Sequence, residues 1–76
     1  MGKTLFIKME RVEHSLENVL ERVRECGGTI SELSARTSLD DSFFFVRLSL
    51  NGSGSPEHIR DELARLGSIR QVDLLS

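Results

Sequence analysis

The sequence predicts an α+β fold in which a four-stranded antiparallel sheet carries two helices on one face. Two segments show the helical spacing of apolar residues, and four segments alternate between apolar and polar residues as strands do. Their order along the chain is strand, helix, strand, strand, helix, strand. With right-handed crossovers, this is the ferredoxin-like βαββαβ arrangement, which leaves the second face of the sheet open. We expect residues 1–76 to form a single domain.

The first strand and the first helix are predicted from two different periodicities. Residues 4–10 alternate cleanly, so they are expected to form a half-buried strand. Residues 15–26 carry apolar side chains at the i, i+3, i+4, i+7 spacing of one buried helical face. Ser15 is expected to be the N-cap of this helix. Gly27 and Gly28 are expected to end it, because glycine readily adopts the left-handed backbone of a C-terminal cap.

The second strand is predicted at residues 30–39. Ile30, Leu33 and Ala35 are expected to face inward, and the three-residue step from Ile30 to Leu33 implies a turn or a bulge. The alternate positions are polar, as in an edge strand with one wet face. Residues 40–42 are expected to form a polar turn.

The central strand is predicted at residues 42–50, which hold three of the four phenylalanines. Every second side chain is apolar and is expected to pack against the helices. The intervening side chains point to the open face, where they meet those of the first strand, its neighbour in this fold. Exposed aromatic residues on a sheet face usually bind something. We therefore predict a partner-binding face formed by Phe6, Lys8, Phe43, Phe45 and Arg47.

The second helix begins with a strong signal. Ser55 is expected to be its N-cap, and Pro56 suits the first helical position. The apolar stripe that follows predicts a helix at residues 56–66, which Gly67 ends. Residues 69–75 are expected to form the last strand.

Composition narrows the possible functions. The net charge of −2 gives no reason to expect nucleic acid or an anionic membrane as a partner. One cysteine cannot form an internal disulfide, and no apolar run approaches the ~20 residues of a membrane span. We therefore expect a soluble, cytoplasmic chain. A chain this short buries only about 60% of its unfolded surface, so association with a copy or a larger partner is expected.

No residue pattern predicts catalysis or metal binding. The positions of His14 and His58 indicate exposed residues near helix starts, and Cys26 is expected to act as a small hydrophobe at a helix end. One cysteine and two separated histidines do not form a zinc ligand set.

The aromatic residues of the predicted open face resemble those of an RNA-recognition motif. Residues 5–7 and 43–46 are similar to parts of its two signatures. However, Asp41 and Ser42 stand where that family has a basic residue and a glycine. Phosphate would also be repelled by three carboxylates expected on this face, those of Glu10, Glu32 and Asp73. RNA binding is therefore kept as an alternative only.

Over residues 5–75 the chain resembles an ACT domain. The resemblance is carried by residues 14–28, Ile30 and Leu33, and further by the Asp-rich turn, the alternating strand at residues 44–50 and the Ser-Pro start of the second helix. Within this family the chain is most similar to the short, single-domain small subunit of acetohydroxyacid synthase, also called acetolactate synthase.

The resemblance implies a non-catalytic regulatory subunit in branched-chain amino acid biosynthesis. Such a subunit forms a homodimer, binds the large catalytic subunit of acetolactate synthase and raises its activity. Thiamine diphosphate, Mg²⁺ and flavin would belong to that partner, and this chain would bind none of them. A free-standing ACT domain that senses an amino acid is the alternative.

In many ACT relatives an amino-acid effector binds between the first loop, the start of the first helix and a later asparagine. This chain has His14 in place of the first-loop glycine and Thr29 in place of the asparagine. Both replacements count against amino-acid feedback, and a vestigial pocket is the alternative interpretation. If an effector binds, the resemblance implies a site formed by Val12, Glu13, His14, Thr29 and Ile30.

Overall fold

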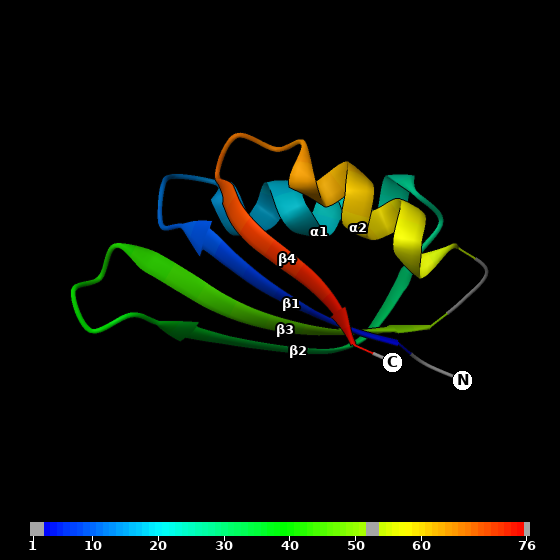
Figure 1. Cartoon of the computed structure of the whole chain (residues 1–76), viewed down its shortest axis with the longest axis horizontal. Coiled ribbons are helices and arrows are strands. Elements are labelled where there is room, and N and C mark those ends of the chain that lie inside the picture. Colours follow the sequence, from blue (N-terminus) through cyan, green and yellow to red (C-terminus); the bar gives the residue numbers. More distant parts are fainter. Residues whose placement is uncertain (1–2, 52–53, 76) are drawn as a thin grey trace.

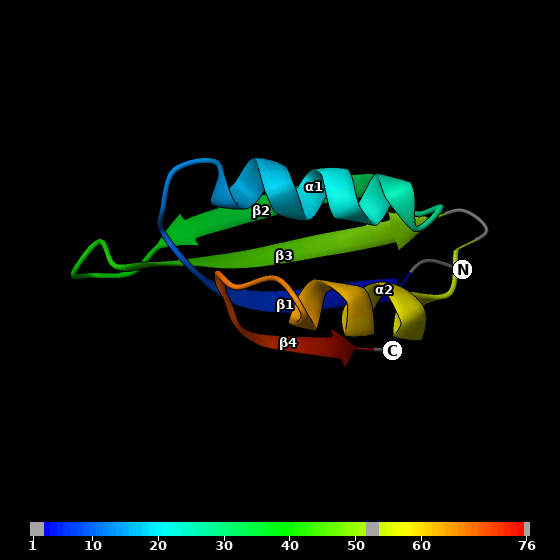
Figure 2. The ribbon, with the colours of Figure 1, turned by 90° about the horizontal axis from the view of Figure 1, so that it is seen from above.

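The computed structural model describes residues 3–51 and 54–75. Residues 1–2, 52–53 and 76 of the predicted domain lie outside the described part. The four strands form one antiparallel sheet in the order β2-β3-β1-β4, and both helices lie on the same face of it (Figures 1 and 2). The predicted fold class is therefore confirmed. The elements are β1 (Lys3–Glu10), α1 (Ser15–Glu25), β2 (Thr29–Thr37), β3 (Phe43–Asn51), α2 (Pro56–Ala64) and β4 (Ile69–Leu75).

The hydrophobic core lies between the helices and the two central strands. Leu5 of β1 is directly opposite Leu48 of β3, and both are fully buried. Burying side chains of this size contributes about 1.5–3 kcal/mol each. The buried core consists of Leu5, Ile7, Met9, Val19, Val23, Val46, Leu48, Leu50, Ile59 and Leu63.

The start of α1 differs from the prediction. His14 is the N-cap, with a left-handed backbone (φ 63°) and no side-chain cap hydrogen bond. Ser15 is the first helical residue; its backbone N–H donates to Val12 O at 3.1 Å. Ser15 therefore lies inside the first turn and is not the cap. Ser15 is 2% exposed, and its Oγ has no hydrogen-bond partner among the described residues.

The end of α1 and the start of α2 follow the sequence signals closely. Gly27 has a φ of 83°, and Gly28 N donates to Val23 O at 3.0 Å, which closes the C-terminus of α1. Ser55 Oγ accepts a hydrogen bond from His58 N at 3.3 Å, as an N-cap does. However, α2 ends two residues before the predicted boundary, because Arg65 and Leu66 donate to carbonyls three residues back.

For β2, one prediction is confirmed, and two, the burial of its inward residues and its last residue, need correction. The bulge near its start is confirmed, since its pairing with β3 shifts between Ile30 and Glu32. Its inward residues are not fully buried: Ile30 is partly buried against the core, whereas Leu33, although it lies on the helix side of the sheet, is 44% exposed. The strand also ends at Thr37 rather than at residue 39, where the chain turns.

Candidate functional site: the open face of the sheet

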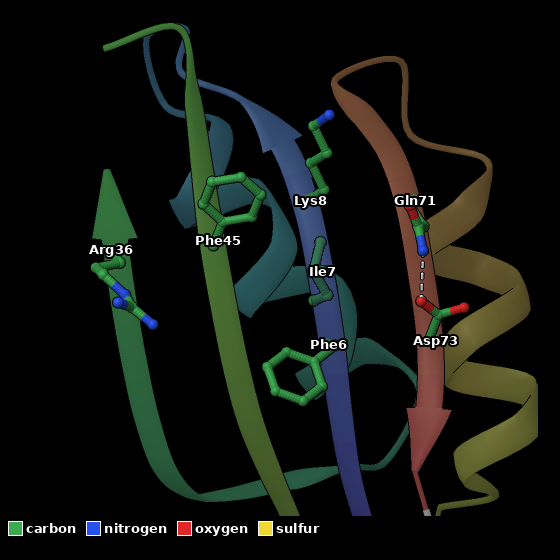
Figure 3. Close-up of a pocket in the computed structure, with 7 residues that line it drawn as sticks. All are labelled: Phe6, Ile7, Lys8, Arg36, Phe45, Gln71 and Asp73. Carbon is green, nitrogen blue, oxygen red and sulfur yellow. Dashed lines mark hydrogen bonds between the residues drawn. The ribbon is translucent and has the colours of Figure 1, made fainter. Parts of the chain in front are cut away.

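The face of the sheet opposite the helices presents two exposed phenyl rings near its centre. Phe6 is 41% exposed and Phe45 is 45% exposed, and they come from the neighbouring strands β1 and β3 (Figure 3). Phe6 is paired with Arg47, and Phe45 is paired with Lys8. Each ring therefore has a cationic residue directly opposite it on the adjoining strand. The expectation that this chain's own helices leave the rings uncovered is confirmed.

Two of the cations lie over aromatic rings. The guanidinium of Arg47 is 5.1 Å from the centre of the Phe6 ring, and Lys8 Nζ is 4.6 Å from the centre of the Phe43 ring. Such contacts are worth about 0.5–1 kcal/mol at exposed sites, because the ring face carries partial negative charge. The long cationic side chains are thus held near the sheet.

A shallow groove of about 320 Å³ runs across the open face. Arg36 of β2 lies at one side of it, and Gln71 and Asp73 of β4 lie at the other (Figure 3). Gln71 Nε2 donates to Asp73 Oδ2 at 2.6 Å, so this carboxylate is already hydrogen-bonded. The lining residues are Phe6, Ile7, Lys8, Arg36, Phe45, Gln71 and Asp73.

The structure brings the five predicted face residues together on one surface. Phe6, Lys8 and Phe45 line the groove. Phe43 and Arg47 contact them through the ring contacts described above. Arg36 and Gln71 also line the groove, although neither is among the five residues predicted for the partner-binding face. Both residues occupy polar positions that alternate with inward-facing ones along the outer strands. This pattern places them on the open face, but only the strand register places them beside the groove.

The first loop forms a second hollow, of about 370 Å³, at the start of α1. Val12, Glu13 and His14 line it, as expected for an effector site. The ring of His14 lies between two carboxylates, with Nε2 3.4 Å from Glu13 Oε1 and Nδ1 3.3 Å from Glu17 Oε2. The hollow therefore carries acidic groups beside the helix N-terminus.

Thr29 and Ile30 do not join this hollow. They begin β2, beyond the far end of α1, whose 11 residues span about 16 Å. The five predicted effector residues are therefore divided between the two ends of a helix, and one chain alone does not assemble them.

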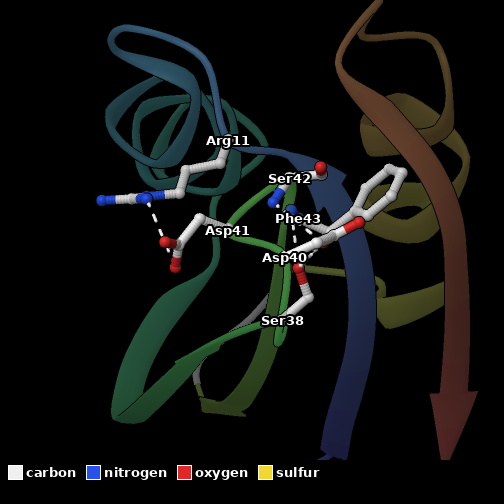
Figure 4. A network of polar contacts seen from close by, with 6 residues as sticks. All are labelled: Arg11, Ser38, Asp40, Asp41, Ser42 and Phe43. Atoms are coloured by element: carbon white, nitrogen blue, oxygen red, sulfur yellow. Dashed lines mark hydrogen bonds and ion pairs between the residues drawn. The ribbon is translucent and has the colours of Figure 1, made fainter.

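The β2–β3 turn is fixed by polar contacts and is joined to the first loop (Figure 4). Asp40 Oδ1 accepts from Ser38 Oγ at 2.8 Å and from Ser42 N at 3.1 Å. These hydrogen bonds, first that of Ser38, lower the pKa of the Asp40 carboxyl below its ordinary value of 3.8. Asp41, with a φ of 62°, lies 3.7 Å from the guanidinium of Arg11. The predicted polar turn is confirmed.

The other described side chains of the types used in catalysis or metal binding do not lie together. Burial, followed by the charge of Glu62, raises the pKa of the Cys26 thiol above its ordinary value of 9.0, which disfavours the nucleophilic thiolate. His58 is exposed at the start of α2. Among residues 3–51 and 54–75 there is no group of three potential metal ligands. No helix in the described part of the chain is long and apolar enough to cross a membrane.

Neither a protein-family model nor a curated protein sequence matches the chain. Solved structures do match it. The ACT domain from the GTP pyrophosphokinase of Chlorobium tepidum aligns with a TM-score of 0.82 and 13% identity, over 99% of this chain and 97% of that domain. The C-terminal domain of the MgtC protein from Mycobacterium tuberculosis aligns with a TM-score of 0.70 and 13% identity, over 97% of this chain and 84% of that domain.

A formyltetrahydrofolate deformylase from Pseudomonas putida also matches, with a TM-score of 0.80 and 15% identity. The alignment covers all of this chain but only 29% of the deformylase, so the chain spans less than a third of that protein. These likenesses define the class of fold: the described part of this chain has the ferredoxin-like ACT fold.

Proposed function

We propose that this chain is a non-catalytic regulatory subunit of the ACT type, which binds and activates the large catalytic subunit of acetolactate synthase. The observation that carries the proposal is a complete ACT fold whose open face displays an aromatic and cationic groove. Residues 14–28, which form α1 and its flanks, carry the more specific resemblance to the small subunit of that synthase.

A subunit of this kind acts by binding alone. It raises activity when it binds the active conformation of the catalytic chain more tightly than the inactive one. Thiamine diphosphate, Mg²⁺ and flavin belong to the catalytic chain in this proposal. A non-catalytic role is supported by the distances along the fold between the residues that most often act in catalysis. His14 lies before α1, Cys26 lies after it, and His58 lies at the start of α2.

The decisive experiment mixes the purified chain with the acetolactate synthase catalytic subunit encoded in the same genome. Acetolactate production should rise with added chain until it saturates, and the two proteins should co-elute in gel filtration. The same amount of heat-denatured chain is the control. Unchanged acetolactate production together with separate elution would refute the proposal.

Homodimer formation is part of this proposal. β2 is an edge strand, and all of it except Ile30 is exposed, so its unpaired backbone edge can be covered by a second copy. A second copy could also bring its own Thr29 and Ile30 to the first loop, which one chain cannot do. Light scattering after gel filtration should give twice the mass of one chain; a monomer at all accessible concentrations would contradict this part.

The first-loop hollow favours a second candidate function, an amino-acid sensor that works without a catalytic partner. The hollow lies at the N-terminus of α1, where backbone N–H groups can bind a carboxylate. Calorimetry with the twenty amino acids tests it: a sensor should bind one of them with saturable heat in the absence of other proteins. Glu13 and Glu17 at this hollow act against a carboxylate ligand, so we place this candidate second.

A further inference from the structure

The open face holds cations that lack carboxylate partners. Within residues 3–51 and 54–75, Lys8, Arg36 and Arg47 form no ion pair. On the helix side, by contrast, Arg22 and Arg65 both contact Glu62 at 3.3 Å.

The open face also carries carboxylates: Glu10 is paired with Arg70, Asp73 is hydrogen-bonded to Gln71, and Glu32 lies on β2. The face therefore has no excess of positive charge, but three described cations at or beside the groove are without an ion pair, and carboxylates of a partner could pair with them.

Two of the three rings on this face already have a cation over them, which leaves less ring surface for stacking on nucleic-acid bases. Arg47 already lies over one face of the Phe6 ring, and Lys8 lies over one face of the Phe43 ring. Base stacking uses a free ring face, as in RNA-recognition motifs. The groove between Phe6 and Phe45 instead offers an apolar floor that suits an aliphatic side chain.

We infer that the open face binds a segment of the catalytic subunit in which aliphatic side chains are flanked by carboxylates. The aliphatic groups would occupy the groove between Phe6 and Phe45, and the carboxylates would pair with Lys8, Arg36 and Arg47. This inference rests on the proposed function and adds to it the binding surface and the chemistry of its partner.

The homodimer proposed above forms through the edge of β2. Pairing along that edge would extend the sheet and leave its open face uncovered. The occupant of the open face is therefore expected to be a different protein.

The test measures the dissociation constant of the full chain for the purified catalytic subunit, at low and at high salt. Phe45→Ala should raise the constant about 30-fold, as loss of a central aromatic anchor does. Arg47→Glu should weaken binding about tenfold and flatten its salt dependence. Leu39→Ala, a fully exposed residue in the β2–β3 turn, and Arg24→Glu, an exposed cation on α1, are matched controls. Both should change binding by less than about twofold.

Circular dichroism establishes that each variant is folded. If Phe45→Ala does not fold, Arg36→Glu on the exposed edge strand provides the same test through charge alone. If the wild-type chain binds the catalytic subunit and both Phe45→Ala and Arg47→Glu bind it equally tightly, this inference is overturned and the proposed function stands. Absence of wild-type binding would overturn both. Dimer dissociation caused by Phe45→Ala, or salt-sensitive oligonucleotide binding lost in that variant, would also overturn the inference, because the occupant would then be a second copy or RNA.

Discussion

Arg47 and Phe6 lie directly opposite each other on β3 and β1, with the guanidinium 5.1 Å from the centre of the ring. We expect this pair to be coupled by about 0.5 kcal/mol, the usual strength of an exposed cation–aromatic contact. A double-mutant cycle with Phe6→Leu and Arg47→Gln, measured by chemical denaturation, gives this coupling. The same cycle between Phe6 and Arg36 should be additive, because those two residues are not paired with each other. Equal coupling in both cycles would contradict the contact.

Gly28 occupies a position where any side chain would collide with the core. A β-carbon built on it would lie 2.9 Å from Ile59 Cδ1 and 3.0 Å from Val23 Cγ1. We expect Gly28→Ala to lower the free energy of unfolding by about 1–3 kcal/mol, the usual cost of overpacking a buried site. Thermal or urea unfolding measures this change.

Gly67→Ala is the matched control for that substitution. Its β-carbon would meet nothing within 4 Å, and its backbone does not require a positive φ. The change should leave stability unaltered or raise it by up to about 1 kcal/mol, since alanine restricts the unfolded chain. If both variants were destabilised equally, the cause would be loss of glycine in general and not the packing against Ile59.

The alternation of side chains was enough to predict which residues of β1 and β3 reach the open face. Successive side chains of a strand point to opposite faces of the sheet, so the face of Phe6 and of Phe45 is determined once the other face is assigned to the core. The groove was less predictable. Arg36 and Gln71 join it because β2 and β4 pair with the central strands in particular registers, and those registers depend on a bulge in each pairing.

The start of α1 shows a different limit of sequence reasoning. Ser15 has the residue type of an N-cap, but capping requires the preceding chain to enter in an extended conformation. Here the residue before the helix, His14, has a left-handed backbone and is the N-cap, so Ser15 is the first residue of the helix. Residue type predicts that a helix begins nearby, whereas the backbone of the loop decides which residue is the cap.

The β2–β3 turn should respond to pH through Asp40. The hydrogen bond from Ser38 Oγ is the largest cause of the lowered Asp40 pKa. A lowered pKa in the folded chain means that the ionised carboxylate stabilises the turn above pH 3.8 and that this contribution is lost as the pH falls through the folded pKa. In Ser38→Ala the Asp40 pKa should rise toward its ordinary value, as measured by NMR titration of the side-chain carboxyl carbon.

Ser34→Ala is the control for that titration. It removes an exposed serine hydroxyl from β2, away from the turn, and should leave the Asp40 pKa unchanged. A lowered Asp40 pKa that persists in Ser38→Ala would show that the remaining hydrogen bonds, first that from the backbone N–H of Ser42, are enough to hold the carboxylate ionised.

The left-handed backbone of His14 gives the last prediction. At a φ of 63°, a β-carbon crowds the neighbouring carbonyl, which costs about 1–2 kcal/mol for most residues and almost nothing for glycine. His14→Gly should therefore unfold at a higher denaturant concentration than His14→Ala, with a difference of about 1 kcal/mol in the free energy of unfolding. Both variants lose the imidazole contacts with Glu13 and Glu17, so the comparison isolates the backbone. At Glu21, an exposed position within α1, the order should reverse, because glycine is about 1 kcal/mol worse than alanine inside a helix. If alanine were the more stable residue at both positions, α1 would not begin through a left-handed residue.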